Sequence, residues 1–118
     1  MNELNGKEVL VPTFEQIVYV NGSTMKFHGR THGIRNENLL HFMIDSVFNH
    51  FKDENLLDLS FLLFQKIVQL CPFVDENKKT ATVTCDFMLK MNDVNVKVPD
   101  DLYYRLCYEI ARKKLKEL

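Results

Sequence analysis

The sequence predicts an all-α fold of about five helices, with at most short β segments. Apolar residues recur at three-and-four spacing in the second helical segment, and the third segment is apolar nearly all round. Asn-Gly, Asn-Asp and proline breakers separate the helical segments. The chain has 118 residues, of which 46% are hydrophobic. That length supplies one core, so residues 1–118 are expected to form a single domain.

Charge and cysteine content exclude several classes of protein. The chain carries 15 Lys and Arg against 16 Asp and Glu, so no nucleic-acid partner is indicated. No apolar stretch is long enough to span a bilayer, and the N-terminal residues do not resemble a secretory signal, so no membrane partner is expected. The three cysteines form no CxxC pair, which indicates a reducing compartment and a cytoplasmic protein. The sequence gives no oligomeric state.

The first helix is expected after a short strand over residues 9–11. Thr13 and Gln16 have the spacing of a capping box, so the helix begins at residue 14. Asn21-Gly22 is a strong breaker that predicts an end near residue 20, with resumption through residue 27 as the alternative. Gly29 and Gly33 indicate a loop.

The second and third helices follow in residues 37–51 and 56–70. Asn36 is the expected cap of the second, and Asp53 or Asn55 that of the third. The third helix is the expected centre of the bundle, and Pro72 ends it. The second helix has one apolar face: Leu39, Leu40, Met43, Ile44, Val47 and Phe51.

The last two helices are separated by a turn at Asn92-Asp93 and an extended piece over residues 94–98. The fourth helix is expected over residues 77–91, and Pro99-Asp100 starts the fifth. The side of the fifth helix expected to face inward comprises Leu102, Tyr103, Leu106, Cys107, Ile110 and Ala111. From residue 105 to 118 there are five basic and two acidic residues, which indicates a solvated helix end; a partner-binding patch is the less favoured alternative.

The junction over residues 71–80, CPFVDENKKT, is the expected functional site. Phe73 anchors the loop in the core, and Asp75 or Asn77 is the expected cap of the fourth helix. A helix N-terminus attracts anions, and two lysines in its first turn, Lys78 and Lys79, strengthen that attraction while opposing the helix dipole. The pattern favours a phosphate site. The alternative is an ordinary capped helix with two solvated lysines.

This junction resembles the central motif of the Fic and Doc proteins, which share the Fido fold. In the Doc branch the motif is His-x-Phe-x-Asp-Gly-Asn-Lys-Arg-Thr. The chain matches it at Phe73, Asp75, Asn77, Lys78 and Thr80, with Lys79 in place of Arg. Residues 84–94 are similar to the helix that follows the motif, and residues 33–40 to the family's Gly-x-Arg-Asp-x-x-Leu-Leu pattern. The resemblance covers residues 9–98 and implies a Fido-like bundle.

The resemblance implies a transferase that moves a phosphoryl or AMP group from ATP onto a protein hydroxyl, of the toxin–antitoxin type. It implies that Asp75 holds Mg²⁺, that Asn77 supports the loop and the phosphates, and that Lys78 and Lys79 neutralise charge on the transferred group. ATP and Mg²⁺ are the cofactors if the protein is active, and the partner is a protein substrate or an antitoxin-like peptide. Residues 49–55 are the segment expected to present an extended peptide.

Two departures from the motif predict impaired catalysis. Cys71 stands where the family has its general-base histidine, and a thiolate is a better nucleophile than proton carrier. Loss of a general base costs roughly 10²–10⁴-fold in rate. Glu76 replaces the family's glycine and places a carboxylate in the phosphate site, where it stabilises the helix end instead. Asn21 stands near the position of a histidine frequent on the first helix of Doc-like proteins.

Other candidate sites are weaker. His28 and His32 have helical metal-ligand spacing, but the neighbouring glycines favour a loop. His41 and His50 are expected on an exposed face, and Met43, Met88 and Met91 in the core. A Cys71 nucleophile paired with a histidine is a minority interpretation. Three functional classes stay open: an active transferase, a non-catalytic protein- or peptide-binding module, and a structural helical protein with an accidental motif.

Overall fold

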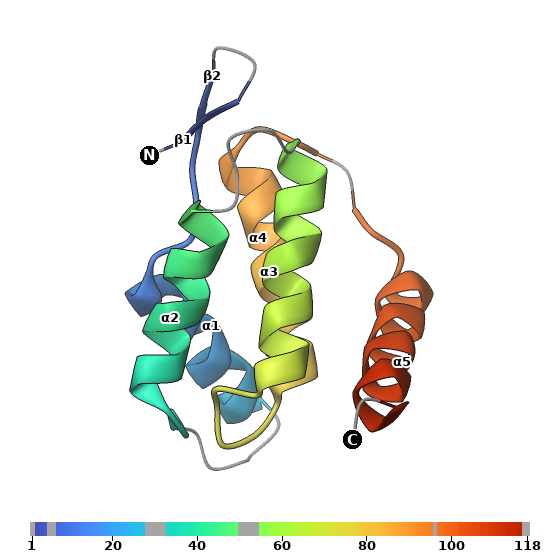
Figure 1. Ribbon diagram of the computed structural model, residues 1–118. Coiled ribbons are helices and arrows are strands. Elements are labelled where there is room, and N and C mark those ends of the chain that lie inside the picture. Colours follow the sequence, from blue (N-terminus) through green and yellow to red (C-terminus); the bar gives the residue numbers. More distant parts are fainter. Residues whose placement is uncertain (1, 5–6, 28–32, 50–54, 96, 117–118) are drawn as a thin grey trace.

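The computed structural model describes residues 2–4, 7–27, 33–49, 55–95 and 97–116. In this part of the chain, five helices follow one short antiparallel hairpin (Figure 1). The all-α prediction is therefore confirmed. The strand expected over residues 9–11 lies earlier and ends at Val9. The elements are β1 (Asn2–Leu4), β2 (Lys7–Val9), α1 (Phe14–Phe27), α2 (Glu37–Asn49), α3 (Leu56–Leu70), α4 (Asn77–Met91) and α5 (Asp100–Lys116).

Helix α3 is the centre of the bundle, as its nearly continuous apolar surface predicts. It packs against α2, α4 and α5, and α1 covers α4 (Figure 1). Helices α3 and α4 are joined by the loop over residues 71–76 and run antiparallel. The fully buried core residues of α3 are Leu59, Leu63, Phe64 and Ile67. The functional junction is therefore a turn between the two most extensively packed helices.

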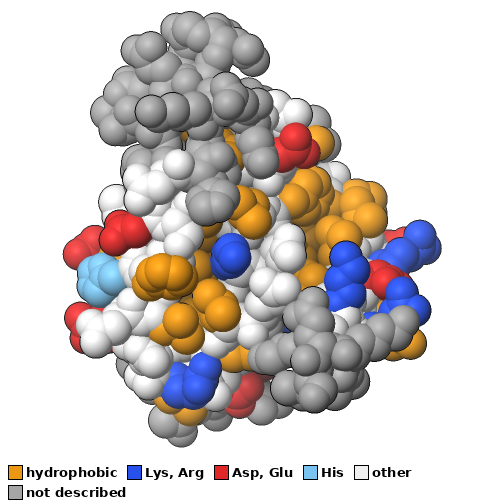
Figure 2. All heavy atoms as spheres, viewed as in Figure 1, with side chains coloured by type: hydrophobic (Ala, Val, Ile, Leu, Met, Phe, Trp, Pro, Cys, Tyr) orange, Lys and Arg blue, Asp and Glu red, His pale blue; other side chains and the backbone are white. Residues whose placement is uncertain are grey.

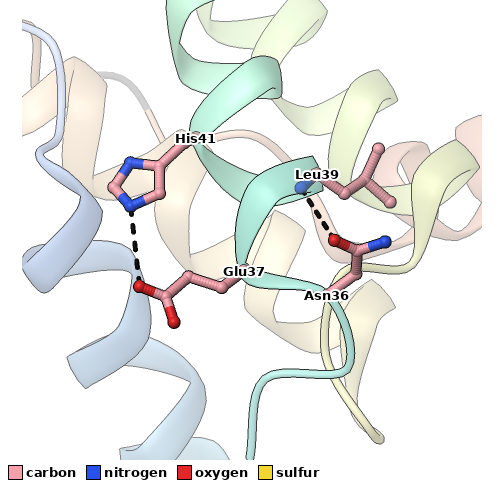
Figure 3. A network of polar contacts seen from close by, with 4 residues as sticks. All are labelled: Asn36, Glu37, Leu39 and His41. Carbon is pink, nitrogen blue, oxygen red and sulfur yellow. Dashed lines mark hydrogen bonds and ion pairs between the residues drawn. The ribbon is translucent and has the colours of Figure 1, made fainter.

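Side-chain caps begin the first three helices at the predicted residues. Thr13 and Gln16 form the reciprocal capping box, with the Thr13 N–H donating to Gln16 Oε1 (2.9 Å) and the Gln16 N–H to Thr13 Oγ1 (3.2 Å). Asn36 Oδ1 accepts from the Leu39 N–H at 3.0 Å (Figure 3). Asn55, not Asp53, caps α3, because its Oδ1 accepts from the N–H of Asp58, the third residue of the helix, at 2.9 Å. Local sequence thus determines these three helix starts.

His41 lies on the exposed side of α2, as expected. Its Nε2 is 3.8 Å from the Glu37 carboxylate one turn earlier (Figure 3), and its ring stacks on Phe14 with centroids 4.1 Å apart. Because Phe14 begins α1, the stacked pair ties the start of α1 to α2. Met43 and Met88 are fully buried, and Met91 is half-buried.

The helix end predicted near residue 20 is wrong and the alternative, helix through residue 27, is confirmed, because α1 runs from Phe14 to Phe27. Glycine inside a helix costs about 1 kcal/mol relative to alanine, a cost that packing readily offsets. Asn21 is 2% exposed and its side-chain amide is hydrogen-bonded to the loop before α4. Tertiary hydrogen bonds therefore override the local breaker signal.

Helix α5 lies at the edge of the bundle. Tyr103 and Cys107 are buried as predicted, but Leu102 is 39% exposed and Ala111 is exposed, contrary to expectation. The reason is that α5 packs on α3 along one side only (Figure 1). Before it, the described residues of the segment 94–98 form no strand.

Asn92 fastens the N-terminal segment to the end of α4. Its Oδ1 accepts from the Leu10 N–H at 2.7 Å, and its Nδ2 donates to the carbonyls of Leu10 and Met88, each at 2.8 Å. The predicted turn residue thus has a tertiary role as well. His28, Gly29, His32, His50 and Phe51, together with most of the predicted peptide segment 49–55, lie outside the described residues.

Candidate functional site

Cys71 caps the C-terminal end of α3 in a left-handed conformation. Cys71 has φ 46° and ψ 60°, and its backbone N–H donates to the Ile67 carbonyl at 3.1 Å. The buried Pro72 follows and prevents continuation of the helix, as predicted. The Cys71 thiol donates to the Val68 carbonyl at 3.3 Å, so its proton is directed back along α3.

Arg35 holds this helix end from another part of the chain. Its Nε donates to the Cys71 carbonyl and its Nη2 to the Leu70 carbonyl, each at 2.8 Å. A guanidinium at the C-terminal end of a helix both satisfies free carbonyls and complements the helix dipole. The segment 33–40 and the start of the 71–80 junction, which both carry the resemblance to the Doc motif, are therefore in direct contact.

The backbone reinforces that contact. The Arg35 N–H donates to the Pro72 carbonyl at 2.7 Å, and the Val74 N–H donates to the Gly33 carbonyl at 3.0 Å. Ile34 and Phe73 form an isolated antiparallel bridge. Phe73 is 1% exposed and anchors the loop in the core, as predicted. The start of the loop is thus held from both sides.

Asn77 closes the loop rather than capping α4. Its Oδ1 accepts from the Phe73 N–H at 3.0 Å, and its Nδ2 donates to the Phe73 carbonyl at 3.1 Å. Asp75 Oδ1 accepts from the Glu76 N–H at 2.7 Å. The expectation that Asp75 or Asn77 caps the helix is wrong, because the cap position belongs to Glu76, whose side chain makes no capping hydrogen bond.

Glu76 adopts a left-handed conformation, with φ 59° and ψ 32°. This region favours glycine, since a Cβ there approaches the following carbonyl. The conformation occurs at the position where the Doc motif has its glycine. The backbone at this position therefore has a conformation that glycine adopts without strain, although the residue is glutamate.

Asn21 joins α1 to both ends of the Asp75–Thr80 segment. Its Nδ2 donates to the Asp75 carbonyl at 3.1 Å and to Thr80 Oγ1 at 3.0 Å. Thr80 is fully buried. The sequence pattern indicates a helix breaker at Asn21 and a departure from Doc-like proteins. No local signal identifies this role, because it depends on contacts 54 and 59 residues away.

Lys78 and Lys79 are exposed in the first turn of α4, beside a groove between α4 and α5 of about 480 Å³. Glu76 also lines this groove. Cys71, Asp75 and Asn77 are not among its lining residues, so the predicted base does not line the groove that the lysines line. The other lining residues are Thr82 of α4 and Asp100, Tyr103, Tyr104, Cys107, Tyr108 and Ala111 of α5.

The tyrosines of α5 were not identified as site residues from the sequence. Three of the four tyrosines in the chain, Tyr103, Tyr104 and Tyr108, line the lysine groove. Their spacing places them on one side of α5, but only the packing of α5 shows that this side meets α4. The groove therefore combines two ammonium groups, aromatic rings and two carboxylates.

The two buried residues that line the groove, Tyr103 and Cys107, are uncharged at neutral pH. Burial raises the pKa of Cys107, and the nearby Lys78 partly opposes that rise. Burial, and hydrogen bonds with Cys85 and Asp86, raise the pKa of Tyr103, whose hydroxyl donates to Asp86 Oδ1 at 2.7 Å. Among the residues that line the groove, the ionic groups are those of Glu76, Lys78, Lys79 and Asp100.

Comparisons with known proteins add no relative. No family model, curated protein or solved structure matches the chain. The relation to Fic and Doc proteins stays a prediction that rests on the motif and its spacing.

A resident metal site is not formed by the described residues, among which no group of three or more His, Cys, Asp or Glu side chains is placed to hold an ion. Mg²⁺ that arrives bound to a nucleotide needs fewer protein ligands, since it is usually held by one or two carboxylates together with phosphate oxygens and water. The half-buried Asp75 supplies such a carboxylate.

Across the same described ranges, no helix combines the length and apolarity needed to cross a membrane.

Proposed function

We propose that this chain binds ATP with Mg²⁺ at the start of α4 and is a Doc/Fic-like transferase, acting in the cytoplasm, whose transfer activity is impaired. One observation carries the proposal: the two exposed lysines begin a helix whose preceding loop is held by Arg35, Asn77 and Asn21. A loop held by these hydrogen bonds and followed by a helix N-terminus with two cations is suited to phosphate.

Phosphate binding depends on the balance of charge at the helix tip. Lys78 and Lys79 attract the polyphosphate, and the N-terminal end of the 15-residue α4 adds its dipole. Glu76 opposes this attraction from the same groove. The ATP affinity of the native chain is therefore expected to be weak and strongly dependent on salt.

Asp75 is the carboxylate proposed to hold Mg²⁺, which supplies charge neutralisation at the phosphates when it is bound. Asn77 keeps the loop closed through the two hydrogen bonds to Phe73, so its function is support of the loop. Lys78 and Lys79 stabilise the charge on the transferred group. Tyr104 and Tyr108 supply aromatic surface in the same groove for the base.

Impairment follows from the residue in the general-base position. The Cys71 thiol donates to Val68 and does not line the lysine groove, and it lacks the two-sided hydrogen bonding of imidazole. A proton from an attacking hydroxyl therefore meets no imidazole at the motif's general-base position. Glu76 adds to the impairment, because its carboxylate lines the same groove as the lysines and repels phosphate.

Labelled ATP tests the proposal directly. The native chain and the double variant Cys71→His/Glu76→Gly are incubated with α- or γ-labelled ATP, Mg²⁺ and cell extract. Label transfer by the double variant alone is expected, and the position of the label distinguishes AMP from phosphoryl transfer. Robust transfer by the native chain would contradict the impairment.

ATP binding is measured separately by calorimetry. Lys78→Ala/Lys79→Ala is expected to abolish binding, whereas Lys90→Ala, an exposed lysine in the last turn of the same helix, leaves it unchanged. No ATP binding by either the native chain or Glu76→Gly would favour the second candidate, a non-catalytic protein- or peptide-binding module. An apolar pocket of about 370 Å³ between α1 and α4, lined by Tyr19, Val20, Val83 and Phe87, favours that candidate, because such a hollow accepts an apolar side chain of a partner.

A further inference from the structure

Tyr103 connects α5 to two other helices at once. Its ring packs on α3, with centroid distances of 5.2 Å to Phe64 and 6.5 Å to Phe61. Its hydroxyl reaches α4, where it donates to Asp86 Oδ1 at 2.7 Å. Tyr103 is 2% exposed, so little water competes for the hydroxyl. One side chain therefore ties α5 both to the centre of the bundle and to the helix that carries the two lysines.

The two attachments of α5 differ in kind. On the face shown in Figure 2, hydrophobic side chains gather between α3 and α5, and α5 packs more extensively on α3 than on α4. Apolar contact has no preferred direction, so it holds α5 on the bundle without fixing which side of α5 faces α4. A hydrogen bond to a carboxylate is short and has a defined geometry. The Tyr103–Asp86 contact is therefore suited to set the rotation of α5.

The rotation of α5 decides where the tyrosine wall of the lysine groove lies, a name used here for Tyr104 and Tyr108. Tyr104 follows Tyr103 in the chain, and Tyr108 is one turn further along the same side of α5; both are exposed and line the groove. Lys78 lies near Cys107, the residue before Tyr108. The tyrosine wall therefore faces the lysines while α5 keeps this rotation, and it turns away if the rotation changes.

We propose that Tyr103 is a positioning residue through which the lysine groove selects a nucleoside triphosphate over bare polyphosphate, a role that rests on the proposed function of this groove. Lys78 and Lys79 attract any polyphosphate by charge. A nucleobase adds affinity by stacking on aromatic rings, an effect of roughly tenfold per base. By donating to Asp86, Tyr103 keeps the tyrosine wall beside the lysines, where the base of a bound nucleotide reaches it.

Asp86 acts in this proposal as the acceptor for Tyr103 and not through its charge. A carboxylate near the groove repels phosphate, so removal of the Asp86 charge would by itself strengthen ATP binding or leave it unchanged. Removal of the acceptor has the opposite effect, because the Tyr103 hydroxyl then no longer holds α5 to α4. The two effects differ in sign, which makes Asp86 a sharp test of positioning.

Calorimetry on the full chain measures the binding of ATP and of inorganic tripolyphosphate, each with Mg²⁺. The native chain is expected to bind ATP more tightly. Tyr103→Phe keeps the ring on α3 and Asp86→Ala removes the acceptor, and each is expected to lose roughly tenfold in ATP affinity while tripolyphosphate affinity does not fall. Asp86→Asn keeps an oxygen acceptor and is expected to retain ATP binding. Tyr19→Phe removes an exposed hydroxyl from α1 and is the control.

Four outcomes would overturn the proposal. If Tyr103→Phe and Asp86→Ala bind ATP as tightly as the native chain, or if Asp86→Asn loses as much as Asp86→Ala, Tyr103 does not position the groove although the ATP site stands. An equal loss of ATP and tripolyphosphate binding would show damage to the whole site, and circular dichroism verifies the helix content of each variant. A native chain that binds neither ligand would refute the proposed function itself, and the role of Tyr103 with it.

Discussion

The side-chain amide of Asn21 donates to the buried hydroxyl of Thr80 at 3.0 Å and to the Asp75 carbonyl at 3.1 Å. One residue of α1 thus holds both the loop before α4 and the first turn of α4. Because Lys78 and Lys79 lie between Asp75 and Thr80 in the chain, their backbone is positioned by a contact that neither lysine makes. The proposed phosphate site therefore depends on a residue outside the motif.

Replacement of Asn21 by alanine is expected to destabilise the fold. The substitution leaves the buried Thr80 hydroxyl without this donor, at a cost of about 1–3 kcal/mol. For a domain of this size each kcal/mol lowers Tm by roughly 4 °C. Thermal and urea unfolding measure the change, and Asn38→Ala, an exposed asparagine of α2, is the control. Equal stability of the two variants would show that the Asn21 hydrogen bonds contribute nothing net.

Glu76→Gly is expected to leave the protein at least as stable as the native chain. A left-handed backbone destabilises a residue that has a Cβ by about 1–2 kcal/mol. The Glu76 carboxylate at the helix N-terminus stabilises the fold by only about 0.3–1 kcal/mol. Glu76→Ala keeps the strain and loses the carboxylate, so it is the informative control. In urea unfolding, the free energy of unfolding of Glu76→Gly should exceed that of Glu76→Ala by about 1 kcal/mol. The reverse order would mean that the left-handed geometry is not strained.

The helix ends show what local sequence determines. The Thr13–Gln16 box, the Asn36 and Asn55 caps and the stop at Pro72 all act within four residues, and the structure places each of these boundaries as predicted. The central position of α3 was also predictable, since a helix that is apolar nearly all round must be surrounded. These features follow from short-range chemistry and periodicity.

The site itself was predictable only in part. The position of Lys78 and Lys79 at a helix start follows from local sequence, but the wall that faces them comes from α5, some 25 residues later. Asn21 was misread because its breaker tendency is local whereas its hydrogen bonds are tertiary. The same reason explains Glu76, whose conformation is imposed by the closed loop and not by its own preference.

Arg35 is expected to stabilise the end of α3 through two hydrogen bonds at once. Arg35→Ala should cost about 0.5–1.5 kcal/mol, because the Cys71 and Leu70 carbonyls lose a charged donor that lies near the surface. Arg35→Lys should recover only part of this, since an ammonium group cannot reproduce the two-pronged geometry. Urea unfolding measures both variants, with Arg105→Lys on α5 as the matched control. If Arg35→Lys is as stable as the native chain, the positive charge alone stabilises the end of α3, and the two-pronged hydrogen bonding contributes nothing further.

The buried Cys85–Tyr103 contact predicts a loss of stability at alkaline pH. Burial raises the pKa of Cys85 from 9.0 to about 11; the hydrogen bond with Tyr103 opposes the rise and the charge of Asp86 adds to it. The folded protein therefore holds this proton more tightly than the unfolded chain. The resulting stabilisation is complete below pH 9 and is lost as the pH rises to 11, amounting to about 2–3 kcal/mol. The raised pKa values of Tyr103 and Cys107 act in the same direction.

Urea unfolding at pH 8, 9, 10 and 11 measures this dependence. The midpoint is expected to be level up to pH 9 and then to fall. Cys85→Ala lowers the overall stability because it leaves a cavity, but it should also flatten the fall, since one of the titrating groups is removed. Tyr19→Phe, which removes an exposed phenol, should leave the pH profile unchanged. If the unfolding midpoint of Cys85→Ala falls with pH as steeply as that of the native chain, the fold does not protect this thiol from ionisation. The packing of α4 against α5 around Cys85 would then be looser than the burial of Cys85 and Tyr103 indicates.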